Sequence, residues 1–174
     1  MQVLADEPQN LATVMNRLNK ITCQNCPSNR YITFFFCLLD PATGDLSYCN
    51  AGHNPPVVVR TNGSVEYLDG GGLVLGILSI ANYAEYKAAL EAGDVLAIYS
   101  DGVTEATNAN QDEFGDERFA EVLKAHRQKS ATEIVGAVNQ ALTDFVAGSP
   151  AADDITLVVA RRVLRTSGPA RLGA

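Results

Sequence analysis

The chain changes abruptly from apolar to polar in the run Val95-Leu96-Ala97-Ile98-Tyr99-Ser100-Asp101-Gly102-Val103-Thr104-Glu105-Ala106. Residues 95–99 are apolar at every position, which predicts a strand covered on both faces. Ala92-Gly93-Asp94, directly before the run, is a turn signal. We therefore predict a buried strand that places the Asp101 carboxylate where the chain leaves the core.

Two interpretations are open for Asp101-Gly102. Asp-Gly is typical of a tight hairpin turn, but a hairpin needs a second strand. Residues 104–113 are polar and do not alternate, so they offer no such strand. We favour the second interpretation, in which Gly102 lets another group approach the backbone closely.

A second acidic site precedes the apolar run 155–160, where Asp153 and Asp154 are adjacent. Two neighbouring carboxylates repel each other unless they are solvated or neutralised by a cation. An ordinary Asx turn that opens the strand is an equal alternative for this segment alone. These acids offer only hard oxygen ligands, which suit Mg²⁺ or Mn²⁺ better than zinc.

Four motifs in order and spacing resemble the SpoIIE/RsbU branch of bacterial metal-dependent protein serine/threonine phosphatases. The resemblance covers about residues 33–162. The motifs are Asn50-Ala51-Gly52-His53-Asn54-Pro55-Pro56, then Gly93-Asp94 leading into Tyr99-Ser100-Asp101-Gly102-Val103-Thr104-Glu105-Ala106, then Phe114-Gly115, and finally Asp153-Asp154-Ile155-Thr156.

The resemblance implies hydrolysis of phosphoserine or phosphothreonine on a partner regulatory protein, typically an anti-sigma-factor antagonist in sigma-factor or stress-response control. It implies direct attack by metal-activated water, with two Mn²⁺ or Mg²⁺ ions in the complete domain. Asp101 and Asp153 are then the candidate metal ligands, with Asp154 as a further one, and Gly102 supports the site.

His53 lies in an irregular segment fixed by Gly52 and two prolines, where histidine is more often a structural residue. The match to the family signature makes it a candidate catalytic residue nevertheless. It also makes Asn54 a candidate substrate-binding residue.

The family has an upstream metal-binding segment of the Gly-Asp-Val/Ser-Gly type, and nothing in Met1 to Asp6 matches it. We therefore expect an N-terminally incomplete catalytic domain over residues 1–163, followed by a flexible tail over residues 164–174. The alternative is a non-catalytic phosphatase-like domain or remnant that binds a protein. The oligomeric state is open.

The chain has 174 residues, of which 47% are hydrophobic, and a formal net charge of −7. This length and composition predict one acidic globular domain. An acidic surface argues against nucleic acid and anionic membranes as partners. No apolar stretch is long enough to span a bilayer and no signal-peptide pattern opens the chain, so we expect a cytoplasmic location.

Cysteine chemistry has little support. Cysteine-dependent phosphatases need a reactive thiolate followed at a fixed short spacing by a phosphate-binding arginine, and Cys23, Cys26 and Arg30 do not give that spacing. The Cys23–Cys26 pair also lacks the second pair of ligands that a zinc site requires.

The predicted order of elements is a helix, several antiparallel strands, two helices and a closing strand, which is an α+β pattern. The strand over 31–39 is apolar on both faces and should lie inside a sheet. The family resemblance implies a four-layer αββα sandwich of two antiparallel sheets flanked by helices. The predicted helices cover 8–23, 116–126 and 131–147, and the other predicted strands cover 46–49, 57–60, 65–68, 84–90, 95–99 and 155–160.

Overall fold

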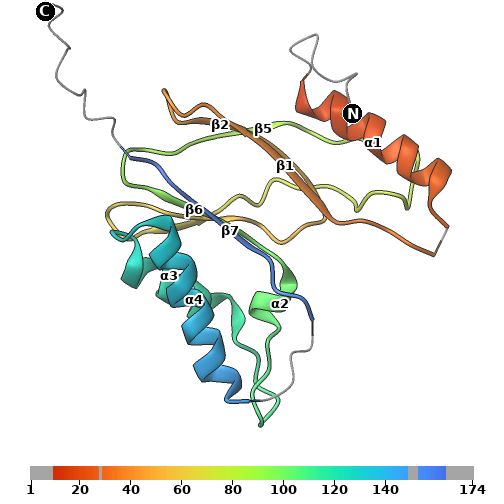
Figure 1. The fold of residues 1–174 in the computed structure, drawn as a ribbon. Coiled ribbons are helices and arrows are strands. Elements are labelled where there is room, and N and C mark those ends of the chain that lie inside the picture. Colours follow the sequence, from red (N-terminus) through yellow and green to blue (C-terminus); the bar gives the residue numbers. More distant parts are fainter. Residues whose placement is uncertain (1–9, 28, 149–152, 164–174) are drawn as a thin grey trace, which may run out of the picture.

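Two antiparallel sheets lie face to face in the computed structural model, which describes residues 10–27, 29–148 and 153–163 (Figure 1). The first sheet has the strand order β1-β2-β5, with β1 at Phe34–Leu39, β2 at Asp45–Ala51 and β5 at Tyr86–Ala89. The second has the order β4-β3-β6-β7, with β4 at Val65–Tyr67, β3 at Val57–Val59, β6 at Val95–Tyr99 and β7 at Leu157–Arg161.

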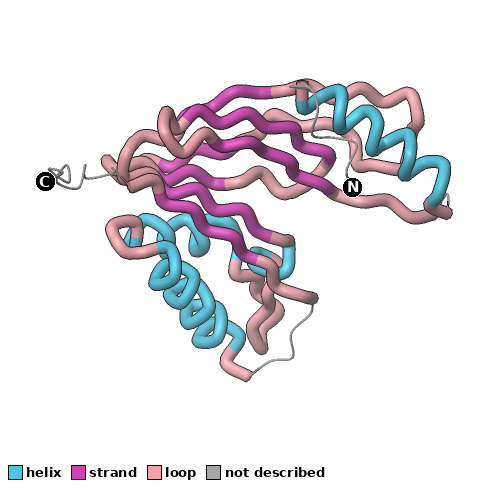
Figure 2. Tube along the Cα trace, turned by 45° about the horizontal axis from the view of Figure 1, so that its top comes forward, coloured by secondary structure: helices cyan, strands magenta, loops and turns pink. Residues whose placement is uncertain are grey.

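Helices cover the outer faces of both sheets. Helix α1 (Leu11–Asn25) packs on the first sheet, and helices α3 (Gly115–His126) and α4 (Ala131–Val146) pack together on the second. Figure 2 shows α1 and the α3–α4 pair on opposite sides of the strands. The predicted α+β fold and the four-layer αββα order are therefore confirmed.

Three separate apolar clusters fill the three spaces between the layers. The cluster between the second sheet and its helices includes Tyr99, Val103, Phe119, Leu123, Ile134 and Val138. The cluster between the sheets includes Leu46, Tyr48, Val58, Leu68, Leu90 and Leu96. The cluster under α1 includes Leu11, Met15, Cys49, Ala51, Leu75 and Tyr83. Strands β3 and β6 are covered on both faces, which is why their sequences are apolar at every position.

Strand β6 is buried at four of its five positions, as its sequence predicts. It pairs with β3 on one side and with β7 on the other, and in the β7 pairing Val95 lies opposite Arg161 and Tyr99 opposite Leu157. The chain then enters the short helix α2 (Asp101–Thr104) and does not form a hairpin. This excludes the hairpin interpretation of Asp101-Gly102.

Local signals set the helix ends. The Asn10 side chain accepts a hydrogen bond from the Ala12 N–H at the start of α1, and Ser130 and Glu133 form the predicted capping box at the start of α4. The predicted first turn at Pro8 and the predicted tail at 164–174 lie outside the described residues. Among the described residues, no helix combines the length and apolar character that a bilayer crossing requires.

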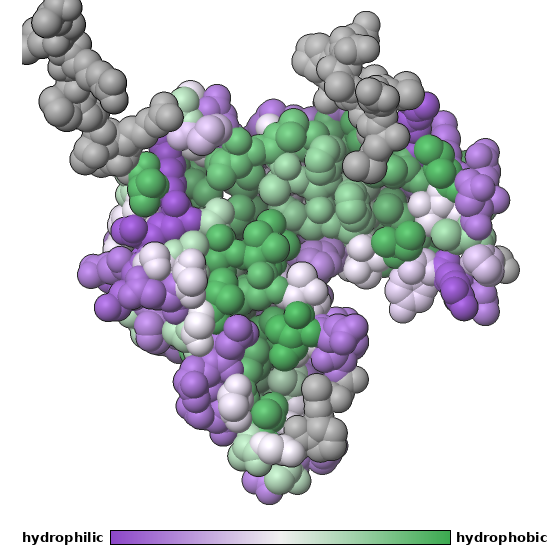
Figure 3. Space-filling model, viewed as in Figure 1, coloured by the Kyte–Doolittle hydropathy of each residue, from purple (hydrophilic) through white to green (hydrophobic). Residues whose placement is uncertain are grey.

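The prediction that the strand at 31–39 lies inside a sheet is wrong for the described residues. Strand β1 pairs only with β2 and forms an edge, and its Leu38 side chain is 57% exposed. Strand β7 forms an edge of the second sheet, and its Val158 side chain is also exposed. Figure 3 shows apolar surface along both edge strands. Apolar sequence predicts burial of a strand's faces, but it does not specify how many strands pair with it.

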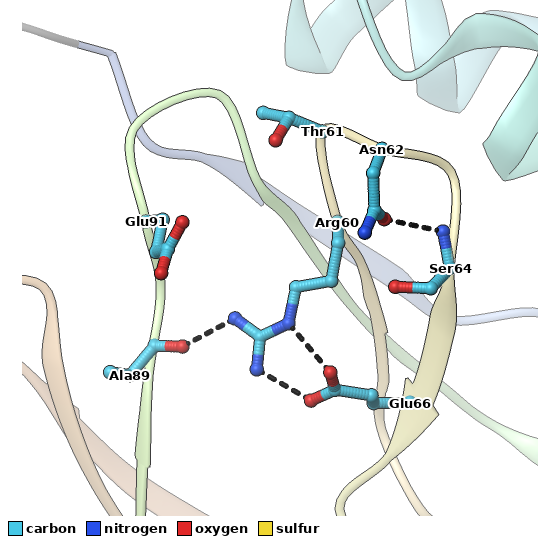
Figure 4. A pocket seen from close by; sticks show the side chains of 7 residues that line it. All are labelled: Arg60, Thr61, Asn62, Ser64, Glu66, Ala89 and Glu91. Atoms are coloured by element: carbon cyan, nitrogen blue, oxygen red, sulfur yellow. Dashed lines mark hydrogen bonds and ion pairs between the residues drawn. The ribbon is translucent and has the colours of Figure 1, made fainter.

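A buried carboxylate organises the turn before β6. Asp94 is 1% exposed and accepts hydrogen bonds from Arg60 Nη1 at 2.8 Å, Thr61 N at 3.0 Å and Glu91 N at 2.8 Å. The same guanidinium group binds both oxygens of the exposed Glu66 carboxylate and the Ala89 carbonyl oxygen (Figure 4). The hydrogen bonds from Arg60 hold the pKa of Glu66 below its usual range. Asp94 therefore has a fully satisfied structural role.

Replacing Asp94 with asparagine should lower the free energy of unfolding by about 3 kcal/mol, because it leaves a partly buried guanidinium without its buried charge partner. The matched control is Glu66→Gln, which removes the exposed partner of the same guanidinium and should cost no more than about 1 kcal/mol. Urea denaturation of both variants measures the difference. Equal losses would show that burial of Asp94 contributes nothing.

Candidate functional site

Asp101 is placed by the end of a buried strand. It is the first residue of α2, directly after the Ser100 N-cap, and its side chain is exposed. Asp101 Oδ1 accepts a hydrogen bond from the Gly102 N–H at 2.9 Å. Its carbonyl oxygen accepts from Glu105 N at 2.8 Å and from the Thr104 hydroxyl at 3.3 Å. The carboxylate thus stands at a fixed point where β6 leaves the core.

The pairing of β6 with β7 brings the second acidic segment to the same place. Beyond the Tyr99–Leu157 pair, Ser100 N donates to the Thr156 carbonyl oxygen at 2.9 Å. Ser100 Oγ accepts from Thr156 N at 2.9 Å and donates to the Asp154 carbonyl oxygen at 3.1 Å. One serine side chain therefore ties the Asp101 segment to the Asp153–Asp154 segment.

Gly102 permits this close approach. A Cβ atom built on Gly102 would lie 2.5 Å from the Asp154 carbonyl oxygen and 3.6 Å from the Asp153 carbonyl carbon. Any larger residue would push the two backbones apart. The absence of a side chain at Gly102 therefore sets the spacing between the two acidic segments, which is the role expected from the sequence.

His53 lies in a loop held by the buried Asn50 side chain. Asn50 Nδ2 donates to the His53 carbonyl oxygen at 2.9 Å, and Asn50 Oδ1 accepts from His53 N at 2.8 Å. Gly52 has φ +70°, and a Cβ atom there would collide with the Val74 side chain. The loop is therefore rigidly built around its histidine.

The electrostatics connect His53 to Asp101. Burial lowers the pKa of the half-buried His53, and the negative charge of Asp101 opposes that shift. The negative charge of Asp101 therefore acts on the His53 imidazole. Asn54 follows in the same loop and is half-buried, with no side-chain hydrogen bond among the described residues.

The donor set has the chemistry of a site for hard cations. Asp101, Asp153 and Asp154 are exposed, and none of them pairs with a lysine or arginine within the described residues. Asp153 Oδ1 accepts the N–H of the next residue, Asp154, at 2.7 Å, whereas an Asx turn would use the N–H two residues on. Over residues 10–27, 29–148 and 153–163 no group of three or more His, Cys, Asp or Glu residues could hold a metal ion. Asp101, Asp153 and Asp154 supply hard oxygen ligands, the type that Mg²⁺ and Mn²⁺ prefer, but the described residues do not form a complete set of ligands.

Two residues that position the site, Ser100 and Asn50, are not among the candidate site residues predicted from the sequence. Ser100 could have been predicted from its position between the buried strand and Asp101, where a hydroxyl can form hydrogen bonds with a neighbouring strand. The signal for Asn50 was its place at the end of an apolar strand, because a buried amide needs partners.

Two of the four thiols, Cys37 and Cys49, are poor nucleophiles. All four cysteines are free. Burial raises the pKa of Cys49 to about 11 and also raises the pKa of Cys37. A protonated thiol is a poor nucleophile.

Comparisons with known proteins point to one family. The model of the family described as Stage II sporulation protein E (SpoIIE) matches residues 1–163. The chain is 33% identical to protein IcfG of Synechocystis sp. over 76% of its length, and 32% identical to phosphoserine phosphatase RsbU of Bacillus subtilis over 86% of its length. It spans 21% and 44% of these two relatives, respectively.

The fold is similar to that of a solved structure of the RsbU and RsbW domains of Rv1364c from Mycobacterium tuberculosis. The TM-score is 0.70 at 21% sequence identity, and the match covers 90% of this chain and 43% of the other. At that identity the likeness concerns the fold alone.

Replacing Asp101 with asparagine should lower the pKa of His53 further, because it removes the negative charge that stabilises the imidazolium. Histidine ring-proton shifts followed by NMR across pH measure this, with the His126 resonances as an internal reference. An unchanged His53 titration would show that the two side chains do not interact.

Gly102→Ala should lower the free energy of unfolding by about 2 kcal/mol or more, because the new methyl group meets backbone that cannot rotate away. Gly136→Ala is the matched control, since Gly136 is an exposed residue of α4 with nothing within 4 Å of a built Cβ. That substitution should raise stability by up to about 1 kcal/mol. Thermal and urea unfolding of both variants test the contrast. A stable Gly102→Ala protein would contradict the close approach.

Proposed function

Because the chain belongs to the SpoIIE family of serine phosphatase domains, we propose that it hydrolyses phosphoserine or phosphothreonine on a partner regulatory protein. The observation that carries this proposal is the meeting of Asp101 with the Asp153–Asp154 segment at the ends of β6 and β7. These residues are far apart in sequence, and Ser100 and Gly102 hold their backbones together.

We assign the binding of Mn²⁺ or Mg²⁺ to Asp101 and Asp153, with Asp154 as a further ligand. Support comes from their ligand chemistry, from their exposure and from the absence of a cationic partner among the described side chains. The chemistry that such cations supply when bound is activation of water and stabilisation of the charge that builds on the phosphoryl group.

The protein's own residues would orient the substrate beside these carboxylates. The His53 imidazole can exchange a proton or a hydrogen bond with a phosphate ester, and its position near Asp101 supports a catalytic role. The free amide of Asn54, next along the same rigid loop, is suited to binding a phosphate oxygen.

The substrate proposed is a phosphorylated regulatory protein, such as an anti-sigma-factor antagonist. Support comes from the relative named as phosphoserine phosphatase RsbU, and from the similar solved structure that contains an RsbW domain beside its RsbU domain. Control of a sigma factor or of a stress response is the setting that this substrate implies.

Asp101→Asn and Asp153→Asn should each weaken Mn²⁺ binding by about tenfold or more, which corresponds to about 1.4 kcal/mol. In metal-free buffer the same substitutions should leave the melting temperature unchanged or slightly raised, because they relieve like-charge repulsion. Asp144→Asn, on the exposed face of α4, is the control and should leave Mn²⁺ binding unaltered. Calorimetric titration and thermal melting provide the two measurements.

Turnover of a phosphoserine peptide separates the two candidate functions. Hydrolysis that a chelator abolishes, and that either aspartate substitution removes, supports the phosphatase. Mn²⁺ binding without hydrolysis would support the alternative, a non-catalytic phosphatase-like domain that binds a protein. Unfolding of the Asp153→Asn variant in metal-free buffer would instead assign that aspartate a structural role.

A further inference from the structure

A second cluster of charged side chains lies at the opposite end of β6 from the acidic site. Thr61, Gly93, Arg127, Gln128 and Arg161 line a cavity of about 360 Å³ there. Arg161 lies opposite Val95 at the start of β6, whereas the acidic segments follow Tyr99 at its end. Four steps of about 3.3 Å along the strand separate the two ends, so one small ligand does not reach both.

Both arginines of this cavity are held in place by backbone carbonyl groups. Arg127 Nε donates to the Thr61 carbonyl oxygen at 3.2 Å, and Arg127 Nη1 donates to the Lys124 carbonyl oxygen at 2.9 Å. Arg161 Nε donates to the Arg127 carbonyl oxygen at 3.1 Å. These bonds fix the guanidinium groups and leave Arg127 Nη2 and both terminal nitrogens of Arg161 without a hydrogen bond to the described residues.

No carboxylate neutralises these two charges within the part of the chain that the structure describes. The adjacent cavity, which shares Thr61, contains Glu66 and Glu91. There Arg60 donates hydrogen bonds to the Glu66 carboxylate. Arg60 and two backbone N–H groups also donate to the buried Asp94 carboxylate. Both guanidinium groups therefore keep their positive charge free to bind an anion.

The remaining groups of the cavity add neutral hydrogen-bonding capacity. Thr61 and Gln128 also line it, and the Thr61 hydroxyl and the Gln128 amide make no hydrogen bond to the described residues. Preoriented guanidinium groups are the donors best suited to the paired oxygens of a phosphate group. A hydroxyl and an amide can bind its remaining oxygens.

We propose that the cavity between Arg127 and Arg161 binds a phosphate group, at a site separate from the acidic cluster around Asp101. The group can belong to a free phosphate compound or to a phosphorylated protein segment, because the donors recognise the same oxygens in both. This site goes beyond the proposed hydrolysis and does not depend on it.

The test is a titration of the isotopically labelled protein with inorganic phosphate, followed by NMR in the presence of a chelator so that no metal occupies the acidic cluster. The backbone amides of Thr61, Gly93 and Arg127 should shift and saturate, while those of Ser100 and Gly102 remain in place. A second titration uses a phosphoserine peptide, with the unphosphorylated peptide as its control. Saturation with inorganic phosphate indicates a free ligand, and saturation with the phosphopeptide alone indicates a protein segment.

Arg127→Gln and Arg161→Gln should each weaken the binding by about tenfold, since each removes charge-assisted hydrogen bonds. Arg17→Gln removes the same charge from the exposed surface of α1 and is the matched control. Arg161→Lys keeps the charge but not the planar guanidinium group, and it should weaken binding less than Arg161→Gln does. The lysine variant also serves as the milder substitution if the glutamine variant does not fold. Equal weakening by Arg17→Gln, shifts confined to the Ser100 end, or no saturation with either probe would overturn the proposal.

Discussion

The pairing of β6 with β7 is the interaction on which the candidate site depends. The ladder fixes Tyr99 opposite Leu157, and the Ser100 side chain extends it by two further hydrogen bonds. A register shift of one residue would turn every side chain of β7 to the other face and remove its apolar contacts with α4. Burial therefore enforces the register, and the register places the acidic segments together.

The two ends of β6 carry acids in opposite situations. Asp94, before the strand, is buried and satisfied by Arg60 and two backbone N–H groups. Asp101, after the strand, is exposed and has no cationic partner among the described residues. Gly93-Asp94 and Ser100-Asp101-Gly102 both lie in the motifs from which the sequence analysis predicted the family, yet the first acid is satisfied within the fold and the second has no cationic partner among the described residues. The difference lies in the partners that each carboxylate has.

The loop that carries His53 is held in place by two neighbouring residues, Asn50 and Gly52. The buried amide of Asn50 binds both backbone groups of His53, and Gly52 fits against Val74 where no side chain could. Asn50 and Gly52 can therefore affect the site without contacting a substrate. They set the position of an imidazole whose pKa is already lowered by burial.

The sequence by itself determined the local structure and the identity of the acids. Apolar runs marked β6 and β7, Ser130 and Glu133 marked the start of α4, and the order of four motifs identified the family. Only the tertiary structure decided that β1 lies at an edge among the described strands, that Ser100 joins two distant segments, and that Asp94 is neutralised. The tertiary structure also brings Arg127 and Arg161 to one cavity, where neither pairs with a carboxylate among the described residues. These outcomes depend on contacts between residues far apart in the chain, whereas periodicity and capping signals report only on neighbours a few residues away.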